Sequence, residues 1–340
     1  MEKARQICVF CILIFIFSLV GCSKGNEDLQ TQQTMEEQMS DADAQTAKTG
    51  LAETQSAAIQ TEENEYMTQP AETATDETSE EQTEPITVET DLSNYFDGIN
   101  GAAVIIDTTE NCYRIYNPEL ADTRRSPCST FKIMSSLIAL ENGVIQVDDS
   151  TREWSGEIFG IEEWNRDIDF SDAFRTSCVW YFRQVIDEIG QQVMEEELSR
   201  LSYGNADISD WDGQLNTNNG NPALTGFWLE SSLLISPKEQ AEVMEKIFGG
   251  KSDYSQQTID RLEQVMLLPE QNETGIMIYG KTGMGKAHGI VVDSWFTGFA
   301  DSADKRISFC VYLGETDEKD VSSTKAREIA IEIVSDYYGF

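Results

Sequence analysis

The sequence predicts an α+β domain over residues 93–340. Three observations indicate this class: two strand patterns begin the segment, helical patterns fill its middle, and three further strand patterns precede a final helix. We expect the strands at the two ends to pair into one antiparallel sheet. With 248 residues, the segment is long enough for one large core or two closely packed lobes.

The first predicted elements are a hairpin and an apolar helix. Apolar runs at 102–107 and 112–116 flank the turn sequence TTEN, which is the pattern of a β-hairpin. From Ser129 to Glu141 the apolar residues Ile133, Leu137 and Leu140 recur at helical spacing, and an Asn-Gly pair follows. This pattern predicts a helix that ends at the Asn-Gly pair.

Helices and a long loop are predicted for the middle of the domain. Residues 171–190 predict one continuous helix with a serine N-cap, and residues 191–201 predict another. Residues 203–230 are rich in glycine and asparagine and predict a long ordered loop, a feature that often carries function. Ser236 and Glu239 form a capping-box pattern that starts the next helix.

Three strands and a helix are predicted at the end of the chain. The strands are expected at 275–283, 288–300 and 306–314, joined by short turns, and an amphipathic helix at 323–338. His288 is the single histidine of the chain and is expected in a turn. One histidine excludes an HExxH protease and any multi-histidine metal site.

The first 92 residues predict export followed by a tether. The apolar run at 7–20 is shorter than most membrane spans and indicates a signal peptide over 1–21. The ending LVGC resembles the lipobox of bacterial lipoproteins, in which the cysteine, here Cys22, is lipidated; a signal anchor with an incidental cysteine is the alternative. Residues 22–92 hold 18 acidic and two basic residues with almost no aromatics. We expect them to form a disordered, self-repelling tether.

Charge and cysteine content exclude several classes of function. The net charge is −37 for the chain and −22 for residues 93–340, which argues against nucleic acid as a partner. An anionic substrate would therefore need a local cationic patch. The cysteines outside the export segment have no metal-site spacing, and we expect them to be unpaired, small apolar residues. They are Cys112, Cys128, Cys178 and Cys310.

Two short motifs carry groups suited to catalysis. Ser129 and Lys132 are three residues apart at a helix start, so the ammonium can reach the hydroxyl, and unpaired backbone N–H groups lie nearby. A capping serine with a solvated lysine is the alternative, but this stretch is too apolar to solvate Lys132 easily. Lys281, Thr282 and Gly283 are expected at a strand end, where a cation, a hydroxyl and close backbone approach form a carboxylate-binding edge.

An ordered set of motifs resembles that of class D (oxacillinase-type) serine β-lactamases and the related extracellular β-lactam sensor domains. The motifs are SxxK from 129, SCV from 177, YGN from 203, FWLESSLLISP from 227, YGKTG from 279 and WFTGF from 295. The S-D-N motif of class A enzymes is absent. The resemblance covers nearly all of residues 93–340. It implies an antiparallel sheet of five to seven strands flanked by helices, together with an all-helical lobe.

The resemblance implies a nucleophile and a modified lysine. Ser129 matches the acylated serine, and Lys132 matches the lysine that the family carboxylates with CO₂ to form N6-carboxylysine, the general base. Val179 matches the apolar wall beside this carbamate, Trp228 the indole N–H that bonds it, and Leu229 the residue that gates water. An unperturbed lysine, with a pKa of about 10.4, accepts no proton at pH 7.

The resemblance also implies a set of substrate-binding residues. Ser177 matches the serine that passes a proton to the lactam nitrogen, and Lys281 and Thr282 line the substrate edge. The N–H of Met284 is expected to complete an oxyanion hole with the N–H of the nucleophile. Arg327 matches the arginine that pairs with the substrate carboxylate. Tyr203 and Asn205, which are further markers of the family, are expected to have structural roles.

The sequence therefore predicts a lipid-anchored serine β-lactamase on the extracytoplasmic face of the cell membrane. It would require no metal and no cofactor beyond CO₂ or bicarbonate, and its partners would be β-lactams and the membrane. One rival is a sensor or penicillin-binding domain that stays acylated; the single export segment and the absence of HExxH favour the enzyme. Another rival is a surface lipoprotein with an inert site, which the intact motif residues argue against.

Overall fold

The structure, a computed structural model, describes most of the predicted domain. It describes residues 84–146, 148–215, 220–269, 275–303, 305–316 and 321–339. The predicted signal peptide, Cys22 and most of the predicted tether lie outside the described residues. Within those ranges, no helix is both long and apolar enough to cross a bilayer.

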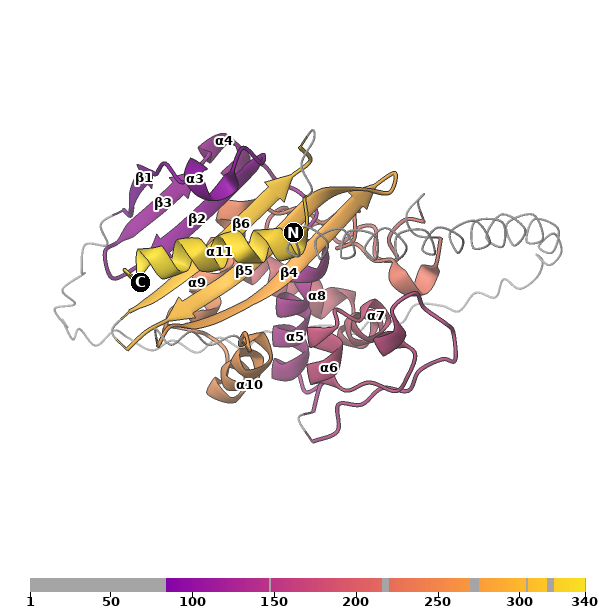
Figure 1. The fold of residues 1–340 in the computed structure, drawn as a ribbon. Coiled ribbons are helices and arrows are strands. Elements are labelled where there is room, and N and C mark those ends of the chain that lie inside the picture. The colour runs from indigo at the N-terminus through magenta and orange to yellow at the C-terminus, as the bar shows by residue number, and fades with distance from the viewer. Residues whose placement is uncertain are drawn as a thin grey trace, which may run out of the picture. The chain divides into compact units, whose positions relative to one another are not determined.

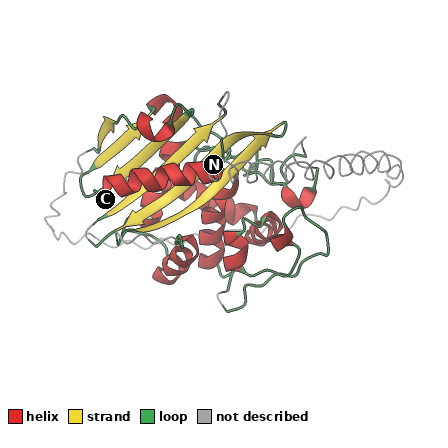
Figure 2. Cartoon of the chain, in the orientation of Figure 1, coloured by secondary structure: helices red, strands yellow, loops and turns green. Residues whose placement is uncertain are grey.

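Six strands form one sheet in the order β1-β3-β2-β6-β5-β4 (Figure 1). They are β1 (Ile86–Glu89), β2 (Gly101–Asp107), β3 (Cys112–Tyr116), β4 (Met277–Ala287), β5 (Ile290–Asp301) and β6 (Arg306–Gly314). The predicted terminal strands meet where β2 pairs with β6, and all pairings are antiparallel except that of β1 with β3. Figure 2 shows this sheet with helices around it, which confirms the predicted α+β class.

The sheet begins inside the segment that the sequence analysis assigned to the tether. The N–H of Ile86 donates to the carbonyl of Asn111 (2.9 Å), and the N–H of Thr90 donates to the carbonyl of Ile115 (2.8 Å). All four side chains of β1 are exposed, so no alternation of buried residues marks this strand in the sequence. The predicted tether boundary at residue 92 is therefore wrong, because backbone hydrogen bonds rather than burial hold this edge strand.

Two helices cover opposite faces of the sheet. They are α9 (Pro237–Phe248) and α11 (Ser323–Tyr337). Successive side chains of a strand point to opposite faces, and β2 follows this rule. Its residues Ala103 and Ile105 pack in the cluster that contains α11, whereas Val104 and Ile106 pack in the cluster that contains α9. The sheet is thus buried on both faces, which explains why the sequence of β2 is an almost continuous apolar run.

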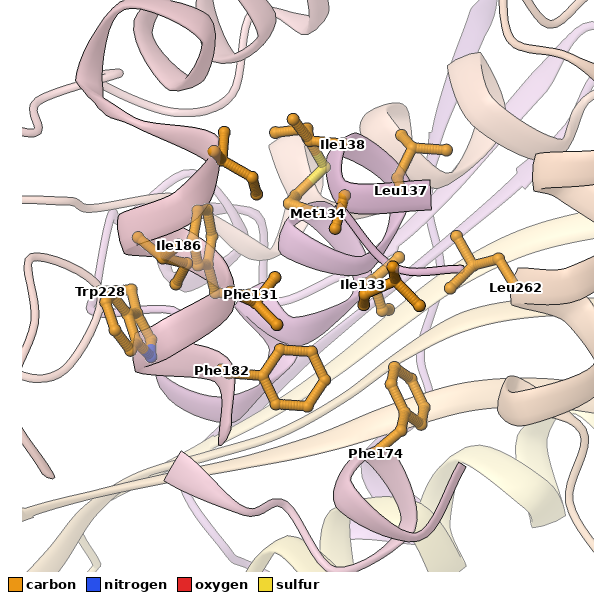
Figure 3. Close-up of a cluster of buried hydrophobic side chains, with 14 of the residues drawn as sticks. Phe131, Ile133, Met134, Leu137, Ile138, Phe174, Phe182, Ile186, Trp228 and Leu262 are labelled. Atoms are coloured by element: carbon orange, nitrogen blue, oxygen red, sulfur yellow. The ribbon is translucent and has the colours of Figure 1, made fainter. Parts of the chain in front are cut away.

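The other long helices form a separate lobe with its own core. They are α5 (Lys132–Glu141), α6 (Phe170–Arg175), α7 (Val179–Ile189), α8 (Gln191–Leu201) and α10 (Gln256–Met266). Shorter segments are α3 (Ser93–Phe96), α4 (Pro118–Ala121) and the 3₁₀ turns η1 (Cys128–Phe131), η2 (Glu162–Trp164) and η3 (Pro222–Leu224). Figure 3 shows part of this core, in which Phe131, Phe182 and Trp228 are fully buried.

Several predicted elements have the expected form. The hairpin at 102–116 and the helix at 191–201 are present, and Ser236 and Glu239 form both hydrogen bonds of the capping box. Within the described part of 203–230, η3 is the only helical segment and no strand occurs. His288 lies in the turn between β4 and β5, with a φ of 51°.

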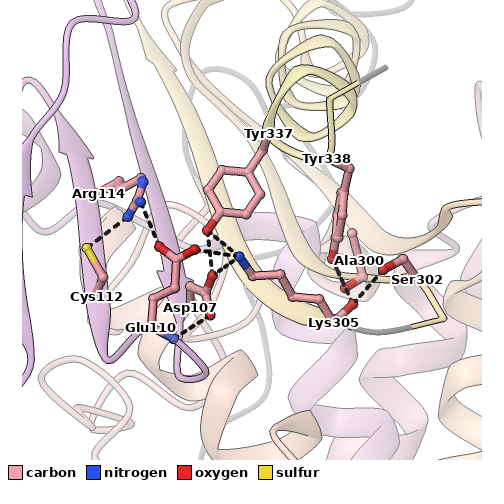
Figure 4. Close-up of polar contacts among 9 residues, drawn as sticks. All are labelled: Asp107, Glu110, Cys112, Arg114, Ala300, Ser302, Lys305, Tyr337 and Tyr338. Atoms are coloured by element: carbon pink, nitrogen blue, oxygen red, sulfur yellow. Dashed lines mark hydrogen bonds and ion pairs between the residues drawn. The ribbon is translucent and has the colours of Figure 1, made fainter.

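A polar cluster ties the C-terminal end of α11 to the sheet (Figure 4). Asp107, at the end of β2, is fully buried and pairs with Lys305. Lys305 also lies 3.0 Å from Glu110 and 3.1 Å from the hydroxyl of Tyr337, and this hydroxyl donates to Asp107. Burial alone would raise the pKa of Asp107, but hydrogen bonds from Lys305 and Tyr337 lower it overall. Asp107 is therefore a paired carboxylate that holds the end of α11.

Candidate active site

Ser129 lies in η1, where β4 meets the helical lobe, and is half-buried. The residue before it, Cys128, has a φ of +50°, a left-handed conformation that few residues other than glycine adopt. The N–H of Cys128 donates to the carbonyl of Trp228 (3.0 Å), which holds this turn in place. The helix predicted from Ser129 is present, but its first turn is a 3₁₀ turn and α5 begins at Lys132.

Lys132 points back at Ser129, as the motif predicted. Its Nζ lies 3.1 Å from the Ser129 Oγ, and its side chain is only 1% exposed. The ring of Phe182 lies 5.4 Å from the same Nζ, and no carboxylate of the described residues forms an ion pair with it. Burial lowers the pKa of Lys132 to about 8. The alternative of a solvated lysine is therefore wrong.

Two thiols near Lys132 give it no counter-charge. Cys128 and Cys178 are buried and unpaired, as expected, and so are Cys112 and Cys310. Burial raises the pKa of Cys128 to about 12 and that of Cys178 to about 11. Both thiols are neutral at pH 7, so the Lys132 ammonium has no anionic partner there.

Ser177 lies at a break between α6 and α7. The single helix predicted for residues 171–190 is wrong, and so is its serine N-cap, because the side chain of Asp169 caps α6 by accepting from the N–H of Asp172. Ser177 has a φ of +57°, which cannot continue a right-handed helix. The break turns the hydroxyl of Ser177 toward Lys281, whose Nζ donates to it at 2.5 Å.

The Lys-Thr-Gly motif lies within β4 rather than at its end, which corrects the predicted strand boundary. β4 is the strand at the opposite edge of the sheet from β1, and it packs against η1. A Cβ on Gly283 would lie 2.9 Å from both the carbonyl oxygen of Pro127 and the Cγ2 of Thr130. Only glycine permits this approach, so Gly283 sets the distance between β4 and the η1 turn that carries Ser129.

Lys281 is the second buried cation of the site. It is 5% exposed, and its Nζ lies 3.2 Å from the carbonyl of Thr282 and 5.7 Å from the ring of Phe174. Burial first, and then the charge of Lys132, lower the pKa of Lys281 to about 7. At neutral pH the two lysines are therefore not both fully protonated, and each has a neutral fraction that can take part in proton transfer.

The strand register places the N–H of Met284 on the free edge of β4. The N–H of Leu268 donates to the carbonyl of Ile278 (2.9 Å) from the side of β4 opposite to β5. Backbone groups alternate in direction along a strand, so every second residue from Ile278 to Met284 shares this edge. The register is unbroken up to the irregularity after Gly285. The N–H of Met284 thus faces the side on which η1 lies.

A cleft of about 240 Å³ brings most of the predicted residues together. Ser129, Ser177, Val179, Thr282 and Met284 all line it. The sequence analysis did not single out four further lining residues: Ile161, Trp164, Thr176 and Ser323. The signal that could have found the first two is an apolar and aromatic pair within the acidic loop FGIEEWNRD.

Arg327 lies in a neighbouring cleft of about 530 Å³, together with Lys281. Thr282 lines both clefts, so the two spaces adjoin at this residue. Arg327 therefore lies in the same cleft as Lys281 and Thr282, and Ser129 is not among the residues that line this cleft. The pairing of Arg327 with a substrate carboxylate stays a prediction.

Trp228 is buried against the Ser-x-x-Lys segment (Figure 3). Its ring stacks on Phe131 with centroids 6.0 Å apart. Its carbonyl accepts from the hydroxyl of Ser126 (3.0 Å) as well as from the N–H of Cys128. Among the hydrogen bonds of the described residues, none uses its indole N–H. Leu229 is half-buried and packs on the core of the helical lobe.

Tyr203 and Asn205 hold the long loop in place, as expected. The side chain of Asn205 donates to the carbonyl of Ser232 (2.8 Å) and accepts from the N–H of Leu234 (2.9 Å). Tyr203 is buried and packs edge-on against Phe131, with centroids 5.7 Å apart. These contacts fix the segment that carries Trp228.

Comparison with known proteins agrees with this geometry. Residues 100–335 match the model of the penicillin binding protein transpeptidase domain. The chain belongs to this family. Regulatory protein BlaR1 of Bacillus licheniformis is 33% identical to this transpeptidase-family chain over 246 residues, which is 72% of the chain and 38% of BlaR1. The chain thus spans well under half the length of that relative.

Two further relatives of this penicillin-binding-protein family member are named as β-lactamases. Probable beta-lactamase YbxI of Bacillus subtilis is 30% identical over 252 residues, which is 73% of this chain and 84% of YbxI. The crystal structure of a class D β-lactamase from Bacillus subtilis matches with a TM-score of 0.62 and 28% identity, over 73% of this chain and 95% of that one. The resemblance to class D β-lactamases and their sensor relatives is confirmed.

Proposed function

We propose that the domain is a serine β-lactamase of the class D type, which opens the lactam ring through a covalent intermediate on Ser129. The observation that carries the proposal is the buried amine of Lys132, 3.1 Å from the Ser129 hydroxyl. With a pKa of about 8, about a tenth of this amine is neutral at pH 7 and can accept a proton. The relatives that are named as β-lactamases support the proposal.

The first step is acylation of Ser129. Its Oγ attacks the lactam carbonyl as its proton passes to the base at Lys132. The N–H groups of Ser129 and Met284 hold the oxyanion that develops. When the C–N bond of the lactam breaks, Ser177 gives a proton to the nitrogen, and Lys281, 2.5 Å from that hydroxyl, replaces the proton.

The surroundings of Lys132 fit a carbamate formed with CO₂. The amine is dry and partly neutral, it has no carboxylate partner among the described residues, and the nearby thiols are neutral. When bound there, CO₂ supplies an anionic oxygen base at the Nζ. Val179 and Phe182 would keep water from this group, Trp228 would donate its indole N–H to it, and Leu229 would control the approach of the hydrolytic water.

The substrate is held at the adjoining edge of β4. Lys281 and Arg327 form a local basic patch beside Thr282, on a domain whose net charge is −22. The ring carboxylate of a β-lactam would pair with this patch, while its carbonyl lies at the oxyanion hole.

A non-hydrolysing receptor is the second candidate function. The similarity to BlaR1, and to a solved structure titled as the C-terminal domain of the Bacillus licheniformis BlaR penicillin-receptor, favours this alternative. Both candidates share the acylation step and differ only in whether water then releases the acyl group from Ser129.

Intact mass of the full chain after addition of a penicillin distinguishes the two functions. We expect a Ser129 adduct that appears and then disappears, together with hydrolysis of a chromogenic cephalosporin, and neither in Ser129→Ala. After acid treatment and degassing, bicarbonate should restore turnover, and ¹³CO₂ should give a carbamate NMR signal that Lys132→Ala lacks. An adduct that persists for hours even with bicarbonate would refute the hydrolase, and the absence of any adduct would refute both functions.

We also propose that the chain is exported and lipid-anchored through Cys22 to the extracytoplasmic face of the cell membrane. The short apolar core and the LVGC sequence support this proposal. The acidic segment that follows would hold the active site away from the membrane surface.

A further inference from the structure

The cleft beside Lys281 and Thr282 carries a concentration of positive charge. Four of its lining residues are basic, namely Arg175, Arg261, Lys281 and Arg327. None of the lining residues that the structure describes is acidic. The positive charge of this cleft is opposite to the net negative charge of the domain. The cleft can therefore attract an anion that the rest of the domain surface repels.

Arg175 keeps a net positive charge despite an ion pair. Its guanidinium lies 3.0 Å from Asp172, but Asp172 also pairs with Arg166 at 2.6 Å. One carboxylate is therefore shared between two arginines. The side chain of Arg175 is 64% exposed, so it can reorient toward a ligand at the mouth of the cleft.

Arg261 is the second cation that the proposed function does not use. Its Nη1 donates to Gln264 (2.9 Å), a neutral partner on the same helix, and Arg261 forms no ion pair within the described ranges. Its Nε is buried without a hydrogen-bond partner in those ranges. Arg261 thus lines this cleft without an ion pair among the described residues, although it also borders a second cleft that contains Glu141 and Asp148.

Most of the other lining residues are apolar, and Ser171, Gln264 and Thr282 are the polar ones. Phe174, Val265, Leu267, Leu268 and Phe296 form the floor and walls between the cations. A ligand group that fits this space has an apolar stem and an anionic end, because the stem covers the floor and the charge meets the arginines.

The chemistry proposed for the cleft of Ser129 determines which part of a substrate enters the cleft of Arg175 and Arg261. In the proposed function, a β-lactam acylated at Ser129 would have its former lactam nitrogen at Ser177 and its ring carboxylate, two bonds from that nitrogen, at Lys281 and Thr282. Thr282 lines both clefts. The substituent beside the carboxylate would therefore extend past Thr282 into the cleft of Arg175 and Arg261.

We propose that this cleft is a specificity subsite for a second anionic group, carried by the substituent next to the ring carboxylate of the β-lactam. The inference rests on the proposed function and adds Arg175 and Arg261 to it as specificity-determining residues. Lys281 and Arg327 bind the ring carboxylate that all substrates carry, whereas Arg175 and Arg261 bind the second anionic group on the neighbouring substituent.

Two cephalosporins with the same acylamino side chain test the inference. One has a propyl group next to the ring carboxylate and the other a carboxyethyl group, each attached through a carbon–carbon bond so that neither is expelled. The rate constant for acylation of the full chain is measured for each compound by intact mass. This readout applies whether or not the acyl group is later hydrolysed.

We expect the anionic compound to acylate the wild type roughly tenfold faster, as two partly exposed ion pairs would provide. The ratio should fall to about one in the double variant Arg175→Gln/Arg261→Gln, and it should shrink as salt is raised. Arg200→Gln is the matched control, because Arg200 pairs with Glu197 on α8 and does not line the cleft. This variant should keep the wild-type ratio.

Acylation by the neutral compound shows that each variant is folded. If the wild type acylates with the neutral compound but shows no preference for the anionic one, the inference is overturned and the proposed function stands. A preference that survives in the double variant also overturns it. If neither compound acylates Ser129, the proposed function fails and the inference fails with it.

Discussion

Replacement of Lys132 by methionine is expected to stabilise the fold while it abolishes activity. The ammonium is buried without an anionic partner among the described residues, and its pKa falls from 10.5 in a model compound to about 8. At 1.36 kcal/mol for each pKa unit, the folded protein loses about 3 kcal/mol at pH 7 by keeping this charge buried. Methionine has a similar length and no charge, so Lys132→Met removes that cost with little change in packing.

The pH dependence of this effect has a definite sign. Between pH 8 and pH 10.5 the unfolded chain holds more protons at Lys132 than the folded chain, so wild-type stability rises with pH over this window. Below pH 8 both states are protonated and the full penalty applies. The advantage of Lys132→Met should therefore be greater at pH 7 than at pH 10, by about 2.5 kcal/mol.

Urea denaturation in CO₂-free buffer, followed by tryptophan fluorescence, measures this difference. Bicarbonate should stabilise only the wild type, because a ligand that binds the folded amine shifts the equilibrium by mass action. A variant that is less stable than the wild type at pH 7, or a difference that does not change with pH, would refute the reasoning. It would show that Lys132 is not a buried, uncompensated charge.

Three further outcomes follow from particular contacts. Gly283→Ala should slow acylation about tenfold or more without loss of secondary structure, because its Cβ would push β4 away from η1; an unchanged rate by intact mass would contradict this. Lys305→Met should lower the free energy of unfolding in urea by about 3 kcal/mol, because Asp107 would remain buried and unpaired, and adding Asp107→Asn should recover much of it. Cys22→Ala should release the chain into the medium, whereas membrane retention on fractionation would indicate a signal anchor.

Elements with strong local patterns could be predicted from the sequence. The helix at 191–201 has the predicted ends, and β6 was predicted at 306–314 because apolar residues dominate this short run. β1 could not be found in this way, because its four residues are exposed and only hydrogen bonds to β3 define it. α10 was not predicted although Ile259, Leu262 and Met266 mark one apolar face, since polar residues dominate the rest of that segment.

The candidate site could be predicted where its residues belong to one short motif, but not where contacts between distant segments determine its geometry. Ser129 and Lys132 are neighbours in one helical turn, so their approach follows from spacing alone. The break at Ser177 is different, because its hydroxyl meets Lys281 from a segment 104 residues away. The local sequence of residues 171–190 therefore predicts one continuous helix. Ile161 joins the cleft only through the tertiary path of its loop.

Because α11 is long, the positions of its residues at the candidate site depend on contacts at the other end of the helix. Its first residue, Ser323, lines the cleft of Ser129, and its last, Tyr337, is held by Asp107 and Lys305. Fifteen residues make a rod about 22 Å long, so a tilt of about 5° at the Tyr337 end moves the other end by about 2 Å. Misplacement on that scale is enough to spoil a catalytic geometry. The position of Arg327 therefore depends on the ion pair between Asp107 and Lys305, which lies at the other end of α11.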